Sequence, residues 1–163
     1  MPVNHKTKND LARTTREKVV NLLNARLADA TDLTLAAKQA HWNVKGPNFI
    51  ALHKLFDEVY ALVAGHVDLI AERAVQLGGN ADGTLQAAAK NTTLKPYSLR
   101  LSAGRDHVDA LSSTMADFGK RIRAAIKETA DWGDADTSDM LTEISRDIDK
   151  QLWFVEAHLE GSR

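Results

Sequence analysis

Helix-breaking residues are rare in this chain, and their positions restrict what it can fold into. The 163 residues include three prolines and nine glycines. The long stretches between them are rich in Ala, Leu, Lys, Arg, Glu and Asp, a composition that favours helix over strand. The length is typical of one domain with a single hydrophobic core. We therefore expect an all-α protein of one domain.

Apolar residues recur every three or four positions inside these stretches, which is typical of amphipathic helices. The first helix is expected to begin near residue 14 and to stop at Gly46 and Pro47, because proline disfavours helical geometry in the residue before it. The second helix is expected over residues 48–78. The turn between them is short, so the two helices should be antiparallel neighbours.

A long connection over residues 79–101, with a short helix at residues 84–90, precedes a third helix that ends near residue 132. Asp136 is the expected N-cap of a fourth helix that extends to about residue 159. Four long helices with one long crossover between the second and the third have the up-down-down-up order of a ferritin-like four-helix bundle. Helices of about 30 residues are roughly 45 Å long, so we expect their outer faces to pack in an oligomer.

The start of the chain differs from the rest in composition. Residues 1–13 predict a flexible, slightly basic tail, and residues 14–160 form the expected bundle. Lys6, Lys8 and Arg13 supply the basic bias of this tail. The whole chain has 21 Lys and Arg against 22 Asp and Glu, a net charge of −1, which excludes nucleic-acid binding through bulk charge.

Two absences narrow the function classes further. The chain has no cysteine, which excludes disulfides, thiolate metal sites and a cysteine nucleophile. No apolar run is long enough for a membrane helix, and the first residues contain no signal-peptide core. We expect a soluble, cytoplasmic protein that makes no membrane contact, with any metal held by His, carboxylates, backbone or water.

Two pairs of possible metal ligands lie on the second expected helix. His53 has a carboxylate four residues later, Asp57, and no other histidine has one three or four residues away. Asp68 and Glu72 repeat the four-residue step, and the two pairs are in phase, because eleven residues rotate to about 20° past three turns. The same eleven residues rise about 16.5 Å, so the pairs cannot share a metal within one chain.

A two-fold axis would bring the two pairs together. If the second helix packs antiparallel against its own copy, facing positions have residue numbers with a constant sum. His53 with Glu72 and Asp57 with Asp68 give the same sum, which places the axis near residues 62–63. Each dimer would then contain two identical sites, each with one imidazole and three carboxylates.

His41, near the end of the first helix, can supply a second imidazole. Two imidazoles with several carboxylates and no thiolate suit Fe(II), Mn(II) or Zn(II). The simpler interpretation is that a His–Asp pair one turn apart belongs to a solvated helix face. A metal site inside one bundle would use Glu-x-x-His pairs. Such a site is disfavoured, because no Asp or Glu precedes a histidine by three residues.

The residues around His41 resemble the signature of the Dps family, and the resemblance extends over about residues 10–159. The matching segments are KQA at residues 38–40, HWNVKGPNF at 41–49, His53 with Asp57, DLIAER at 68–73, AVQLGG at 74–79, SRDIDK at 145–150 and LWF at 152–154. Proteins of this family are mini-ferritins, the DNA-protection proteins of starved bacteria.

The resemblance implies a di-iron centre between two subunits, with manganese or zinc as alternatives to iron. Carried over by position, His41, His53 and Asp57 come from one subunit. Asp68 and Glu72 come from its partner. This division agrees with the two-fold arrangement that the spacing indicates.

The resemblance also implies ferroxidase activity. The family oxidises Fe(II), with hydrogen peroxide as the preferred oxidant and oxygen as the other. It stores ferric mineral in a hollow dodecamer, which protects DNA from oxidative damage. Trp42 is expected either to donate electrons near the metals or to pack at an interface. Lys38, three residues before His41, is expected to balance the charge of the site or to be solvated.

DNA binding is a second expectation from the resemblance, because some family members use a basic terminal tail. Lys6, Lys8 and Arg13 would contact DNA here, and the protein would then be associated with the nucleoid. Two other functions remain open. One is a DNA-compacting shell whose metal site is vestigial or structural, and the other is a monomeric four-helix binding module.

An acidic stripe begins the fourth expected helix, formed by Asp139, Glu143 and Asp147. One interpretation is a solvated helix face with favourable negative charge near its N-terminus. The other is the lining of an iron-entry pore, as family shells have at three-fold axes. The remaining helical histidines are expected to be structural or exposed: His66, His107 and His158.

Overall fold

Every regular element in residues 3–160, the part that this computed structural model describes, is a helix. The elements are α1 (Arg13–Asn43), α2 (Phe49–Gln76), α3 (Leu85–Asn91), α4 (Gly104–Asp131), α5 (Ala135–Glu156) and a short 3-10 helix, η1 (Ala157–Leu159). The all-α prediction is therefore confirmed, and so is the short helix in the long crossover. Within the same residues, no helix is both long and apolar enough to cross a bilayer.

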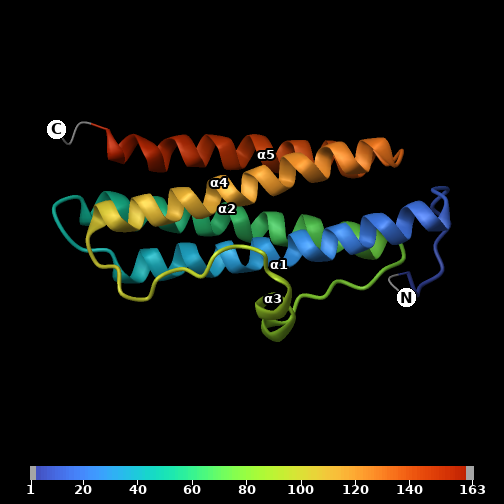
Figure 1. The fold of residues 1–163 in the computed structure, drawn as a ribbon, viewed down its shortest axis with the longest axis horizontal. Coiled ribbons are helices and arrows are strands. Elements are labelled where there is room, and N and C mark those ends of the chain that lie inside the picture. The colour runs from blue at the N-terminus through green and yellow to red at the C-terminus, as the bar shows by residue number, and fades with distance from the viewer. Residues whose placement is uncertain (1–2, 161–163) are drawn as a thin grey trace.

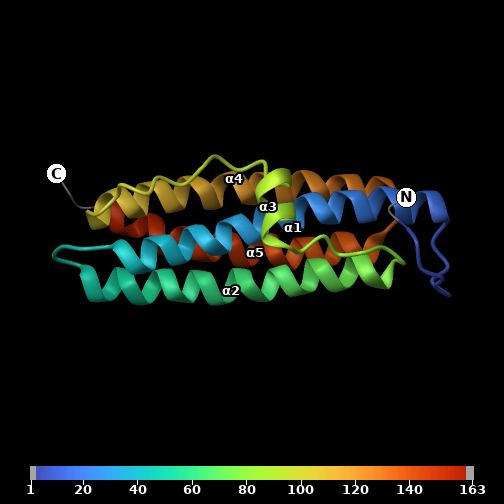
Figure 2. The same cartoon turned by 90° about the horizontal axis from the view of Figure 1, so that it is seen from below.

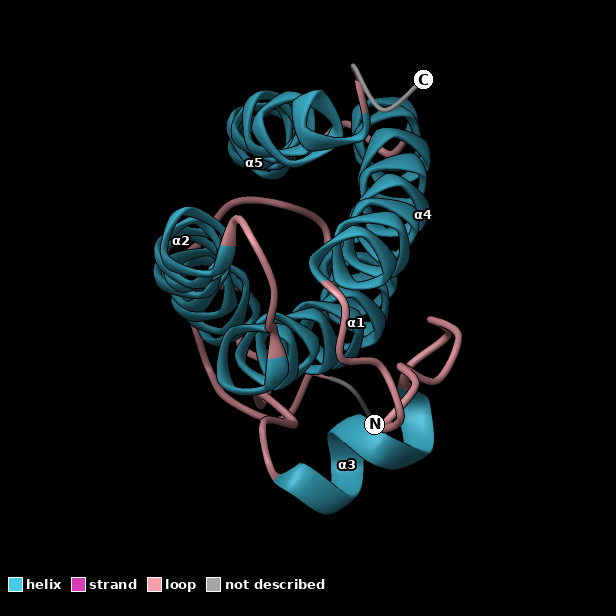
Figure 3. Cartoon of the chain, turned by 90° about the vertical axis from the view of Figure 1, so that its left-hand side faces the viewer, coloured by secondary structure: helices cyan, strands magenta, loops and turns pink. Residues whose placement is uncertain are grey.

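The four long helices form two antiparallel hairpins that pack side by side (Figure 1). α1 pairs with α2, and α4 pairs with α5. The view from below shows that the crossover runs along the outside of the bundle (Figure 2). Seen end-on, α1, α2, α4 and α5 surround a common core, and α3 lies outside it (Figure 3). α3 packs against α1.

All four long helices contribute large apolar side chains to the core. Complete burial of such a side chain is worth about 2 kcal/mol relative to leaving it in water. These residues recur at the three- and four-residue steps that predicted the helices. They include Leu23, Leu27 and Leu33 of α1, Phe56 and Ile70 of α2, Leu111, Met115, Phe118 and Ile122 of α4, and Leu141 and Ile144 of α5.

The turn between α1 and α2 is fixed to the start of α4. α1 ends at Asn43, earlier than the Gly46–Pro47 stop that was predicted. The reason is that Val44 is already extended, which allows backbone pairing across the bundle end. The Lys45 N–H donates to the Ser102 carbonyl at 2.9 Å, and the Gly104 N–H donates to the Lys45 carbonyl at 3.1 Å.

The predicted N-cap of the last long helix, Asp136, was wrong by two residues. Asp134, and not Asp136, is the N-cap, because its carboxylate accepts a hydrogen bond from the Thr137 N–H at 3.0 Å. Gly133 has a φ of +81°, which ends α4 abruptly and places Asp134 directly before the first residue of the next helix. The Arg73 guanidinium of α2 binds the same buried carboxylate at 2.9 Å, so the cap also joins the two hairpins.

A buried carboxylate on α1 holds the crossover. Asp29 is inaccessible to solvent and accepts hydrogen bonds from the Thr93 N–H at 2.7 Å and the Thr93 hydroxyl at 3.0 Å. Arg26 pairs with the other oxygen of Asp29 at 2.8 Å. Because these contacts follow α3 directly, they set its position beside α1.

The segment before α1 lies against the turn that ends α2. The N–H groups of Asn4 and His5 both donate to the Gly78 carbonyl, at 3.0 and 2.9 Å. The Val3 side chain is buried, and the His5 ring contacts Asn80 at 2.8 Å. Residues 1–2, at the start of the predicted tail, lie outside the described residues.

Candidate metal centre

Two histidines meet where α1 and α2 cross near their shared turn. The Nδ1 atom of His41 lies 2.7 Å from the His53 carbonyl oxygen, and the Nδ1 atom of His53 lies 2.8 Å from the His41 carbonyl oxygen. The two rings stack with centroids 3.7 Å apart. Each ring is therefore held by the backbone of the other residue.

These reciprocal contacts determine which ring nitrogens can bind a metal. A carbonyl oxygen only accepts hydrogen bonds, so the Nδ1 atoms must carry the protons. In the neutral form of each ring, the Nε2 atoms of His41 and His53 then keep their lone pairs. A hydrogen bond from the second ring nitrogen to a carbonyl is the usual way in which proteins orient a metal-binding histidine.

Asp57 lies one turn beyond His53 and is bound to Lys38 of α1 by a short ion pair. The hydrogen bond from the Lys38 ammonium lowers the pKa of Asp57, with smaller lowering effects from His41 and His53. Lys38 also lies over the Tyr60 ring, 4.3 Å from its centroid. Lys38 therefore places a positive charge next to Asp57, which agrees with the expectation that it balances the negative charge of the ligands.

Asp68 and Glu72 lie further along α2 and are exposed. Neither side chain makes a hydrogen bond or ion pair with another residue in the described part of the chain. Within residues 3–160, no three His, Asp or Glu side chains are grouped closely enough to hold a metal ion. One chain therefore places His41, His53 and Asp57 at one end of α2, apart from the other two predicted ligands.

The exposed face of α2 has a pattern that reads alike in both directions. Its positions follow each other by three or four residues and are mirrored about a point between residues 62 and 63. An apolar residue stands at each end of this pattern, and two possible metal ligands lie next to it on the inner side. The two central positions are alanines, whose small side chains permit close helix packing. In order these residues are Ile50, His53, Asp57, Ala61, Ala64, Asp68, Glu72 and Val75, and none of them is buried in the single chain.

Apolar side chains surround the predicted ligands on this surface. Ile50 and Val75 are 59% and 52% exposed, and Trp42, at the end of α1, is 66% exposed. A hollow of about 400 Å³ beside Glu72 is lined mainly by apolar atoms of its neighbours on α2 and by Ala81. Large exposed apolar side chains beside the predicted metal-binding carboxylates indicate a surface that another protein covers.

The three acidic residues of the stripe on α5 differ in their surroundings. Asp139 and Glu143 are exposed, whereas Asp147 contacts the Nε2 atom of His66 at 3.1 Å. His66 is almost completely buried between α2 and α5. Sequence reasoning missed this contact because the two residues lie on different helices, 81 positions apart.

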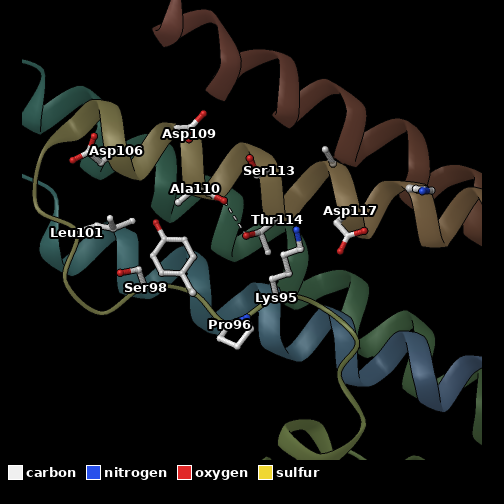
Figure 4. Close-up of a pocket in the computed structure, with 13 residues that line it drawn as sticks. Lys95, Pro96, Ser98, Leu101, Asp106, Asp109, Ala110, Ser113, Thr114 and Asp117 are labelled. Atoms are coloured by element: carbon white, nitrogen blue, oxygen red, sulfur yellow. Dashed lines mark hydrogen bonds between the residues drawn. The ribbon is translucent and has the colours of Figure 1, made fainter.

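Another hollow, of about 720 Å³, lies between the crossover and α4 (Figure 4). None of the predicted metal ligands lines it. The Tyr97 hydroxyl, on its wall, lies 2.9 Å from Nδ1 of the buried His107. Burial lowers the pKa of His107 and raises that of Tyr97, so both are neutral near pH 7 and act as a structural pair.

Comparison with known proteins places the chain in a family. A profile of the ferritin-like domain matches residues 20–163. The DNA protection during starvation protein of Agrobacterium fabrum is 48% identical over 156 residues, which cover 96% of each chain. This protein belongs to the Dps family.

Solved Dps structures agree with this assignment. The tetragonal form of Mycobacterium smegmatis Dps superposes with a TM-score of 0.92 at 34% identity and covers 98% of this chain and 96% of its own. DpsA14 from Streptomyces coelicolor gives 0.93 at 33% identity, with coverages of 99% and 95%. The ferritin-like bundle that the helix order predicted is therefore confirmed.

The contact between Lys38 and Asp57 in this Dps chain gives a prediction for pH dependence. The folded-state pKa of Asp57 lies below its ordinary value of 3.8, so the contact stabilises the fold above that value and loses this effect as the pH falls through the folded-state pKa. We expect Lys38→Met to lower the melting temperature slightly at pH 7. The difference from the wild type should shrink toward pH 3, as measured by thermal unfolding of metal-free protein.

Lys90→Met, on α3, is the matched control, because no described residue forms an ion pair with Lys90. Its melting temperature should differ from the wild type by the same small amount at every pH. A Lys38→Met difference that stays constant from pH 7 to pH 3 would contradict the assigned role of the ion pair.

Proposed function

We propose that this protein is a ferroxidase and iron-storage shell whose iron site forms between two copies of α2. The mirrored face of α2 carries the proposal. An antiparallel copy sets His53 opposite Glu72 and Asp57 opposite Asp68, and His41 joins them through its stacking on His53. Each dimer then has two sites with two imidazoles and three carboxylates.

The donor set fits Fe(II) and its oxidation. The Nε2 atoms of His41 and His53 are the neutral nitrogen donors, and the three carboxylates supply oxygen donors that stabilise the more highly charged Fe(III) product. Two Fe(II) ions give up one electron each, and one hydrogen peroxide molecule takes up both electrons with two protons from solvent to form two water molecules. Removing peroxide and Fe(II) together limits the hydroxyl radicals that would damage DNA. Manganese or zinc would suit the same donors.

Lys38 and Trp42 have proposed roles around this site. Lys38 neutralises Asp57 until iron replaces its ammonium as the cation bound by that carboxylate. Trp42 is adjacent to His41 and largely exposed, so it can be covered by the partner and supply an electron to the centre.

The further assembly follows from the family. We propose a hollow cytoplasmic dodecamer built from these dimers, in which the product is stored as a ferric mineral. Asp139 and Glu143 are exposed and, together with Asp147, are the proposed lining of an entry pore for Fe(II).

Mixed dimers test whether each site is shared between subunits. His53→Ala and Glu72→Gln should each abolish most peroxide-driven Fe(II) oxidation. Co-expression of the two variants should restore it partly, because about half of randomly formed dimers are mixed and each mixed dimer has one intact site. We therefore expect about one quarter of the wild-type sites, measured as the initial rate of ferric absorbance.

A matched control uses two variants whose mutated ligands belong to the same subunit of each proposed site. Co-expressed His41→Ala and His53→Ala should stay inactive, because neither site of a mixed dimer is then intact. Equal activity in the two mixtures would contradict a shared site. Oxidation by the wild type no faster than in a protein-free control would instead favour the alternative, a DNA-compacting shell with a vestigial metal site.

The register of the two α2 helices can be tested with engineered cysteines, since the chain has none. Ile50 and Val75 occupy mirrored positions, so the double variant Ile50→Cys/Val75→Cys should form disulfide-linked dimers under mild oxidation, seen on a non-reducing gel. Each single variant is the control, because its cysteines would be about 37 Å apart along the paired helices. Absence of linkage in the double variant, or equal linkage in the singles, would contradict the register.

DNA binding is a second candidate function, and the Agrobacterium relative is named for DNA protection during starvation. A hollow of about 540 Å³ beside the N-terminal segment is bordered by His5, Lys6, Arg13 and Arg16 and by no acidic residue. Together with Lys8, these side chains form a basic region that would be repeated around a shell. Many weak phosphate contacts would then add together.

We expect the assembled protein to retard plasmid DNA on a gel at low salt, and the retardation to fall steeply as salt is added. Deletion of residues 1–10 should remove most of it while leaving Fe(II) oxidation intact. Retardation that persists in the shortened protein would contradict a mechanism based on this segment.

A further inference from the structure

Three segments that are distant in the sequence meet at the end of the bundle opposite the N-terminal segment (Figure 1). They are the turn between α1 and α2, the start of α4 and the short helix η1 after α5. A hollow of about 440 Å³ lies among them. It is separate from the predicted metal ligands, none of which lines it.

The ionisable side chains around this hollow are all basic. Lys45 of the turn, Arg105 of α4 and His158 of η1 line it, and no aspartate or glutamate does. Within residues 3–160, none of these three side chains forms an ion pair. The nearest acid along α4, Asp106, lines the other hollow shown in Figure 4. In a chain with a net charge of −1, this is a local excess of basic groups.

The backbone around the hollow is fixed and adds to the same charge. The two hydrogen bonds between Lys45 and residues 102–104 hold its floor, and a Cβ on Gly104 would come within 2.7 Å of Leu52 Cδ1. α2 and α4 both begin here, and neither Asn48 nor Ala103 caps its helix with a side chain. The partial positive charge of two helix ends therefore adds to that of the basic side chains.

The shape of the hollow favours a small ligand over a polymer. Pro47, Leu52 and Val108 form an apolar wall, which reduces the hydration of any group that enters. Basic residues that bind duplex DNA are usually spread along a helix or an open face. Here they border one concavity built from three short pieces of chain. Inorganic phosphate, with a compact charge and four acceptor oxygens, matches the donors present.

We propose that this hollow is a binding site for free phosphate or a closely related tetrahedral oxyanion. Lys45 and Arg105 bind its oxygens by charge-assisted hydrogen bonds, and the partial positive charge at the starts of α2 and α4 favours the same anion. The proposal rests on the basic side chains and the hollow that they line, and it does not depend on iron oxidation.

Calorimetric titration of the assembled, metal-free full-length protein with inorganic phosphate, in a buffer without other oxyanions, tests this proposal. We expect saturable binding near one phosphate per chain. The double variant Lys45→Gln/Arg105→Gln should bind at least about tenfold more weakly, because two charge-assisted hydrogen bonds are lost. Arg105→Lys should keep part of the affinity, because it retains the charge.

Lys90→Gln/Arg146→Gln is the matched control, since it removes the same two charges from exposed positions elsewhere. It should bind phosphate like the wild type. Unsaturable binding, or equal losses in the two double variants, would overturn the proposal in favour of general charge attraction. Displacement of bound phosphate by a short DNA duplex would overturn it in favour of a backbone phosphate of DNA. Fe(II) oxidation by the Lys45→Gln/Arg105→Gln variant should match the wild type, which separates this site from the proposed iron centre.

Discussion

The rise of an α-helix is the constraint on which the proposed function depends. Two ligand pairs on one straight helix, eleven residues apart, are separated by about 16.5 Å, too far to bind one metal centre. The phase of the helix nevertheless places both pairs on one face. A helix with these two properties can complete a site only by meeting another copy of itself. Oligomerisation is then a requirement of the proposed chemistry and not an addition to it.

The α1–α2 hairpin orients the two histidines of the proposed site within a single chain. His41 and His53 use each other's backbone carbonyls, so the rings are oriented by the crossing of the two helices and by the turn that joins them. That turn is itself bonded to the start of α4. The orientation of two small side chains is therefore supported by three of the four long helices.

Much of this arrangement could be predicted from the sequence, because helix periodicity and ligand spacing are local properties. The mirrored pairs around residues 62–63 predicted a shared site from one helix alone. Contacts between helices could not be predicted in this way. The stacking of His41 on His53 and the burial of His66 against Asp147 depend on how distant segments pack. The cap of α5 was misplaced because Asp134 and Asp136 are equivalent by residue type, and only the path of the chain after Gly133 distinguishes them.

The buried pair between Arg73 and Asp134 has a consequence for the assembled protein. Arg73 follows Glu72, so the end of α2 that carries the second ligand pair is anchored to α5, whereas the end with His53 is anchored to α1. A ligand that joins the two ends across a dimer axis would connect both hairpins of both subunits. By mass action, any such ligand would stabilise the proposed assembly by a free energy that rises with the logarithm of the ligand concentration. Iron loading and mechanical rigidity would then rise together.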